Sequence, residues 1–166
     1  MKNNRGFTLL ELIVVIAILG ILAGVVSYSI SSVSTTRAKK VTSDLNALIS
    51  QCRVDTLSGS PSPTYLEILK EGDTLYGVLY EGKAEDGAPI VKVKQQLGGS
   101  GITCRYTTAS STTEITGGGT LKLGFVRATG ALDTTDYANC TAINISAGAG
   151  NNAITLVSAT GYHYIN

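Results

Sequence analysis

The sequence predicts an α+β protein in which a long N-terminal α-helix packs on a C-terminal antiparallel β-sheet domain. The first observation is an uninterrupted apolar run from Leu12 to Val26. The second is an amphipathic repeat from Ala38 to Cys52. The third is a set of short alternating segments after residue 57, a region that holds 16 of the chain's 19 glycines. A helix with a hydrophobic first half and an amphipathic second half, followed by a β domain, accounts for all three.

The first half of the helix, residues 7–29, has the length and composition of a membrane-spanning segment. About 20 helical residues rise ~30 Å, which is roughly the thickness of the hydrocarbon layer. Glu11 places one carboxylate in this segment, where an ionisable group is costly and therefore indicates a function. With Arg5 set aside, we expect no partner for Glu11 nearby in its own helix. The segment is interpreted as a membrane helix that moves into another protein environment.

Two simpler interpretations of the N-terminus explain less. In a secretory signal peptide, Lys2 and Arg5 would form the charged region before the hydrophobic core. The apolar run is longer than that core usually is, contains a carboxylate and leads to no A-x-A cleavage site. In a plain membrane anchor, Lys2 and Arg5 would hold the N-terminus in the cytoplasm, but Glu11 would have no role.

The segment Gly6-Phe7-Thr8-Leu9-Leu10-Glu11-Leu12, with the apolar run behind it, resembles the N-terminus of the type IV pilin and pseudopilin superfamily. The resemblance implies that a prepilin peptidase removes the leader, residues 1–6, by cutting between Gly6 and Phe7. It also implies N-methylation of Phe7 and a mature chain of 160 of the 166 residues, in which Glu11 is the fifth. The implied partners are an inner-membrane assembly platform, membrane lipid before assembly, and the subunit itself with other pilins in a helical fibre.

Glu11 is the candidate assembly residue. Cleavage frees an α-amine that is mostly protonated at neutral pH. In a stack of staggered helices, the Glu11 carboxylate of one subunit can meet the amine of its neighbour. An unpaired carboxylate in that core is strongly unfavourable, whereas a paired one is tolerated, so the pair would fix the register between subunits.

The second half of the helix, residues 30–58, is predicted to bury one face against the globular domain. Apolar residues recur there at three- or four-residue steps, with charged and polar residues on the other faces. Leu57-Ser58-Gly59-Ser60-Pro61 predicts the end of the helix. The predicted buried stripe consists of Ala38, Val41, Leu45, Leu48 and Cys52.

Residues 59–166 are predicted to form the antiparallel β domain. Alternation is clearest in Ile90–Lys94 and Leu121–Phe125, and Gly-rich breaks separate the segments. The short connections indicate antiparallel pairing. Residues 63–70 are expected to form a short extra helix. The expected strands are Thr74–Tyr80, Ile90–Leu97, Ile102–Thr107, Thr120–Val126, Ala142–Ser146, Ala153–Val157 and Tyr162–Ile165.

The three cysteines are Cys52, Cys104 and Cys140. In an exported domain disulfides persist, and one pair with one free thiol is the simplest arrangement. Cys104 and Cys140 are the favoured pair because both fall in the Gly-rich β region, with Cys52 packed on the helix. The alternative of three reduced, partly buried thiols stays open.

The charge balance argues against nucleic acid as a partner. The chain has 13 Lys and Arg against 12 Asp and Glu, and loss of Lys2 and Arg5 with the leader leaves side-chain charges of −1. Such a balance provides no strong field for a polyanion. A fainter resemblance to H-type pseudopilins and related minor pilins involves Leu121–Gly130, Ala153–Gly161 and the terminal strand. Some of those proteins bind DNA through basic C-terminal residues, but the tail of this chain has no Lys or Arg after Gly161.

No recognisable catalytic set is present in the sequence. Gly117–Thr120 lacks the lysine and spacing of a phosphate loop, and Gly98–Gly101 lacks the spacing of a nucleophile elbow. Acidic residues near Glu85, or Asp133 with Asp136, could bind calcium by chance only. We therefore expect no enzyme, no cofactor and no specific metal.

The expected function is structural. The chain is interpreted as a pilin, of the major or minor kind, of a type IV pilus that acts in adhesion or surface motility. The alternative is a pseudopilin of a type II secretion or competence (DNA-uptake) system, because the N-terminal motif is shared by both classes. The expected location is the cytoplasmic membrane, crossed once with the domain outside, and then an extracellular pilus or pseudopilus.

Overall fold

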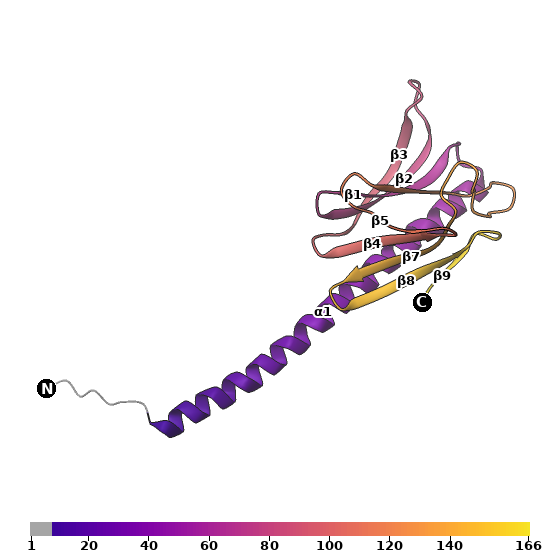
Figure 1. Ribbon diagram of the computed structural model, residues 1–166. Coiled ribbons are helices and arrows are strands. Elements are labelled where there is room, and N and C mark those ends of the chain that lie inside the picture. Colours follow the sequence, from indigo (N-terminus) through magenta and orange to yellow (C-terminus); the bar gives the residue numbers. More distant parts are fainter. Residues whose placement is uncertain (1–7) are drawn as a thin grey trace. The chain divides into compact units, whose positions relative to one another are not determined.

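The structure, a computed structural model, describes the backbone of residues 8–166 and, within it, the side chains of residues 8–24 and 33–166. Within this part of the chain, one α-helix is followed by nine strands in two antiparallel sheets (Figure 1). The prediction of an α+β fold is confirmed. Helix α1 spans Leu9–Ser58, and contacts divide the chain into two compact units, Met1–Val33 and Ser34–Asn166.

The part of α1 that belongs to the Ser34–Asn166 unit buries the predicted stripe. Thr42 lies on the same face and donates its hydroxyl to the Ala38 carbonyl oxygen at 2.8 Å, so its buried polar group is satisfied. The predicted amphipathic helix is confirmed. The buried helix residues are Ala38, Val41, Thr42, Leu45, Leu48, Ile49, Cys52 and Thr56.

The helix ends at Ser58 for a local reason. Gly59 has a φ of +88°, a left-handed conformation that glycine adopts without steric cost. The Ser60 N–H donates to the Asp55 carbonyl oxygen at 3.2 Å and satisfies one of the last helical carbonyls. The helix end predicted at Leu57–Pro61 is therefore confirmed.

The first sheet has four strands in the order β3-β2-β1-β6. Strand β1 is central: it pairs with β2 from Thr64↔Glu81 to Glu71↔Thr74 and with β6 on its other edge. The bounds are β1 Thr64–Glu71, β2 Thr74–Lys83, β3 Pro89–Gly98 and β6 Thr120–Gly124.

The second sheet has five strands in the order β5-β4-β7-β8-β9. One hydrophobic core connects α1 with both sheets and includes Leu45 of α1, Leu79 of β2 and Ile145 of β7. Figure 1 shows the strands of both sheets beside the C-terminal half of α1. The bounds are β4 Ile102–Thr108, β5 Thr112–Glu114, β7 Cys140–Ala147, β8 Gly150–Val157 and β9 Tyr162–Ile165.

The extra helix expected over residues 63–70 is wrong, because the segment is strand β1. Its register gives the reason: Leu66 lies between Leu79 of β2 and Leu123 of β6, and it is fully buried. Pairing on both edges and burial therefore override a local pattern that is compatible with a helix. All seven expected strands are present, Tyr162–Ile165 with the expected bounds and the other six with slightly different ones, whereas β5 was not predicted.

Two helix side chains hold the C-terminal segment. Arg53 donates from Nε to the Gly130 carbonyl oxygen and from Nη2 to that of Thr160, each at 3.0 Å. Ser50 Oγ and His163 Nε2 lie 2.8 Å apart. These contacts attach β9 and the turn before it to α1.

Candidate assembly and processing site

Helix α1 begins with a capping box. Thr8 precedes the first helical residue, and its hydroxyl oxygen accepts the backbone N–H of Glu11 at 3.3 Å. In return, Oε2 of Glu11 accepts the backbone N–H of Thr8 at 2.9 Å and its hydroxyl at 3.0 Å. These reciprocal bonds satisfy two N–H groups that a helix terminus leaves without an intrahelical partner.

The prediction that Glu11 has no partner nearby in its own helix is therefore wrong. The partner that the sequence reasoning missed is Thr8. The sequence does contain a capping-box pattern, because Thr8 is followed three residues later by Glu11 and then by an apolar run. Among the described residues, no hydrogen-bond donor lies on Oε1, so one carboxylate oxygen is available for a second partner.

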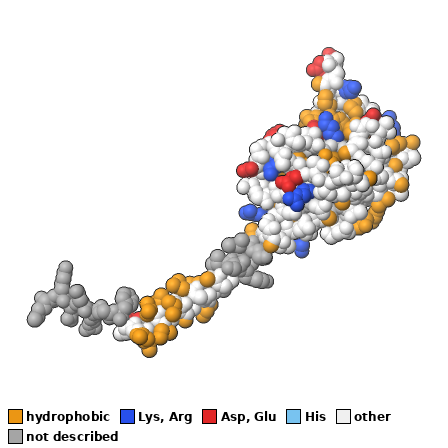
Figure 2. Space-filling view, viewed as in Figure 1, with side chains coloured by type: hydrophobic (Ala, Val, Ile, Leu, Met, Phe, Trp, Pro, Cys, Tyr) orange, Lys and Arg blue, Asp and Glu red, His pale blue; other side chains and the backbone are white. Residues whose placement is uncertain are grey.

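Behind the capping box, the described helix surface is apolar and exposed. Eleven large apolar side chains between Leu9 and Leu22 are 47–75% exposed. They occupy nearly every position instead of one stripe, so all faces of this segment are apolar. Figure 2 shows them in orange along the helix. This segment differs from the part of α1 after Val33, which buries one face only.

The expected processing positions, Gly6 and Phe7, lie outside the described residues. Residues 1–27 match the family model of the prokaryotic N-terminal methylation motif, which is the prepilin signal of type IV pilins and pseudopilins. The chain carries a prepilin signal. This signal supports a protein of the type IV pilin or pseudopilin type, processed by a prepilin peptidase and assembled with other pilins. No curated protein and no solved structure matches the chain.

Two further expectations concern the membrane span and the last third of the chain. In the part of the chain that the structure describes, no helix reaches both the length and the hydropathy needed to cross a membrane. The resemblance of the last third to H-type pseudopilins stays a prediction. Its segments are β6 with the loop that follows, β8 and β9.

The predicted Cys104–Cys140 disulfide is not formed, because the three cysteines are free and buried. In the register of β4 and β7, Cys104 lies opposite Ile145 and Cys140 lies opposite Thr108. The two cysteines are thus four positions apart along β4, about 13 Å at the usual rise per strand residue. Bridged cysteines have Cα atoms within about 7 Å. The arrangement with three reduced thiols is the one the structure contains.

We expect none of the three thiols to react with an alkylating reagent in the folded chain at neutral pH. Burial raises the pKa of Cys52, Cys104 and Cys140 from about 9 to about 12, so little thiolate is present. The same shift makes a contribution to folding stability that is complete below about pH 9 and is lost as the pH rises to about 12. Mass spectrometry should find no label after alkylation of the folded chain and three labels after alkylation in denaturant without reductant. A single label in denaturant would contradict the free thiols.

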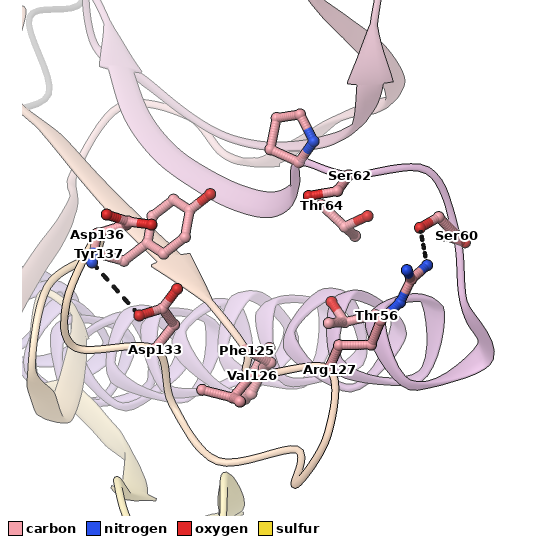
Figure 3. A pocket seen from close by; sticks show the side chains of 11 residues that line it. Thr56, Ser60, Ser62, Thr64, Phe125, Val126, Arg127, Asp133, Asp136 and Tyr137 are labelled. Atoms are coloured by element: carbon pink, nitrogen blue, oxygen red, sulfur yellow. Dashed lines mark hydrogen bonds between the residues drawn. The ribbon is translucent and has the colours of Figure 1, made fainter.

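A pocket of about 350 Å³ lies beside the end of α1 and the loop between β6 and β7. Figure 3 shows Asp133 and Tyr137 on one side of it and Arg127 and Ser60 on the other. Arg127 donates from Nη2 to the Ser60 carbonyl oxygen at 2.6 Å. The Tyr137 ring stacks on Tyr65 of β1 with 5.6 Å between ring centroids. Both contacts attach the loop to its neighbours.

The acidic side chains of Asp133 and Glu81 make local contacts. Oδ1 of Asp133 accepts the backbone N–H groups of Thr135 at 3.0 Å and Asp136 at 3.4 Å, which shapes the loop. Figure 3 shows the bond from Asp136. Glu81 lies 2.6 Å from the Lys92 ammonium, and this hydrogen bond lowers the pKa of the Glu81 carboxyl. Among the described residues, no three or more His, Cys, Asp or Glu side chains are placed to hold a metal ion.

Proposed function

We propose that this chain is a structural subunit of a type IV pilus, a pilin of the major or minor kind, and that it is not an enzyme. One observation carries the proposal: the prepilin signal leads directly into a helix whose apolar side chains are exposed on all faces. Lipid or other apolar helices must cover such a surface. After cleavage, the N-terminal segments of neighbouring subunits would pack on one another in the core of a helical fibre.

The size of the exposed apolar surface determines the order of events. Eleven side chains at about 1.5–3 kcal/mol each represent roughly 15–35 kcal/mol if water covers them. The subunit therefore stays in the cytoplasmic membrane, with its domain outside, until neighbouring helices cover the segment. Between lipid and fibre core the hydrophobic contribution nearly cancels, so packing and polar pairing decide whether the subunit enters the fibre.

Glu11 provides the polar pairing. Thr8 binds its Oε2, and Oε1 has no donor within the described residues. The protonated α-amine of Phe7 in a cleaved neighbour has the opposite charge to the Glu11 carboxylate. In the low dielectric of a helix bundle, an unpaired Glu11 carboxylate is strongly unfavourable and a paired one is tolerated. Subunits would therefore enter the fibre only in the register that forms the pair.

Processing is the first test. We expect the exported protein to begin with N-methylated Phe7, because the resemblance to type IV pilins implies a cut between Gly6 and Phe7. Mass spectrometry of the N-terminal peptide from the membrane fraction measures this start directly. A Gly6→Val variant should keep Met1 and accumulate uncut. Wild-type protein that keeps Met1 after export would contradict the proposal.

The location of the chain distinguishes a pilus subunit from a pseudopilin of a secretion or DNA-uptake system. Fibres sheared from the surface of producing cells should contain the chain, as identified by mass spectrometry and by labelling of long filaments. If filaments lack it and its deletion instead abolishes protein secretion or DNA uptake, the chain is a pseudopilin.

A further inference from the structure

The two ends of strand β3 have opposite surface chemistry. Before β3, the turn of residues 84–88 is exposed and contains Glu85 and Asp86. One oxygen of Asp86 accepts the N–H of Ala88 at 3.0 Å, and among the described residues neither acid is in an ion pair. Strand β1 pairs with β2 only as far as Glu81, so the hairpin continues past the sheet on its own. Figure 1 shows this projection, and Figure 2 shows acidic side chains in red at its end.

At the other end of β3, a groove of about 630 Å³ lies between α1 and the turn into β4. Arg37 and Lys40 of α1 supply its charged side chains, and no acidic residue lines it. Within the described part of the chain, neither cation is in an ion pair. The floor of the groove is apolar and consists of Val41, Leu97 and Ile102.

A subunit cannot place its own hairpin turn in its own groove. The turn precedes Pro89 and the groove begins at Gln96, so most of the ten residues of β3 separate them. At about 3.3 Å per strand residue, the separation is roughly 25 Å or more. Pairing with β2 keeps β3 extended. The acidic turn and the basic groove therefore need a second molecule to meet.

We propose that the β2–β3 hairpin turn of one subunit binds the α1–β4 groove of another copy of this chain, an inference that rests on the proposed fibre. The carboxylates of Glu85 and Asp86 would be the acidic partners of Arg37 and Lys40. Ile90 and Val91, 47% and 51% exposed at the base of the turn, supply an apolar surface next to the charges.

The contact joins two different surfaces of the same chain, so it is heterologous and can continue from subunit to subunit. Such contacts form open helical filaments when the rotation does not close. The domain would then add a specific contact between neighbours, outside the packing of the N-terminal helices.

Cysteine crosslinking tests the contact in the full chain. Ala88→Cys in the turn and Ser100→Cys in the groove, combined in one chain, should give a ladder of disulfide-linked multimers after mild oxidation of sheared fibres and membrane extracts. The three native thiols are buried and do not compete. Each single variant should give no ladder. Equal amounts of multimers in the double and single variants would overturn the inference, as would a crosslink to a different protein.

Charge reversal in the crosslinking chain tests the pairing itself. Arg37→Glu with Lys40→Glu should lower the crosslink yield about tenfold, because like charges then face each other. Adding Glu85→Lys and Asp86→Lys should restore the yield to within about twofold. The matched controls are Lys39→Glu, exposed on α1 but outside the groove, and Asp73→Lys in the β1–β2 turn. Loss without rescue would overturn the inference and would indicate another groove ligand, such as an anionic lipid headgroup.

The same samples separate this inference from the proposed function. If fibres contain the chain and no ladder forms, the hairpin contact is wrong and the pilin function stands. If fibres lack the chain but membrane extracts give the ladder, the contact stands and the fibre function is wrong.

Discussion

Replacement of Glu11 by alanine is expected to lower incorporation of the chain into fibres by more than about a hundredfold. Loss of one partner from a buried ion pair costs about 3–5 kcal/mol, because the remaining charge is left in a low-dielectric core. In the proposed fibre the remaining charge would be the α-amine of Phe7 in the neighbouring subunit. Quantitative immunoblotting of sheared fibres against membrane fractions, in cells that also express the wild-type chain, measures the ratio.

Two matched variants separate assembly from helix capping. Glu11→Gln keeps an oxygen that can accept the Thr8 bonds but has no charge, so it should fail in incorporation as Glu11→Ala does. Thr8→Ala removes the capping box, a loss of about 0.5–2 kcal/mol at one helix end, and leaves the carboxylate free for the neighbour. It should therefore enter fibres nearly as well as the wild type.

The reverse ranking would contradict the assembly role. If Glu11→Gln assembles normally and Thr8→Ala does not, the capping box is the only function of Glu11. The cap uses Oε2 and the proposed pairing would use Oε1, which has no donor among the described residues, so both roles can operate in one subunit.

Elements that depend on local periodicity could be predicted from the sequence. The stripe from Ala38 to Cys52 repeats at helical steps, and burial of these residues follows from that repeat. Gly59 marked the helix end because a glycine is favoured where the backbone must become left-handed. The prepilin signal could be predicted for a similar reason, since the spacing of Gly6, Phe7 and Glu11 is local.

Features that depend on register could not be predicted. Residues 63–70 contain apolar side chains at spacings that suit either a helix or a strand, and pairing with distant β2 and β6 decides for a strand. The distance between Cys104 and Cys140 follows from the offset of β4 against β7, which no local pattern specifies. The groove at Lys40 likewise requires the packing of α1 against the turn after β3.

Gly161→Ala is expected to lower the free energy of unfolding of the Ser34–Asn166 unit by about 2–5 kcal/mol. Gly161 has a φ of +64°, and an added Cβ would overlap the carbonyl oxygen of Gly130. That oxygen accepts the Nε–H of Arg53, which also binds the Thr160 carbonyl oxygen. The methyl group would therefore separate two turns and weaken both bonds to α1. Urea unfolding of the full chain in detergent, followed by circular dichroism, measures the loss.

Gly72→Ala is the matched control, because it separates backbone strain from steric overlap. Gly72 has a similar φ of +58°, but no atom lies within 4 Å of an added Cβ. It should therefore lose only the cost of a left-handed alanine, about 1–2 kcal/mol. The difference between the two variants measures the contact of the Gly161 and Gly130 turns. Equal losses would mean that these turns move apart without cost, and that Arg53 does not hold the C-terminal strand on α1.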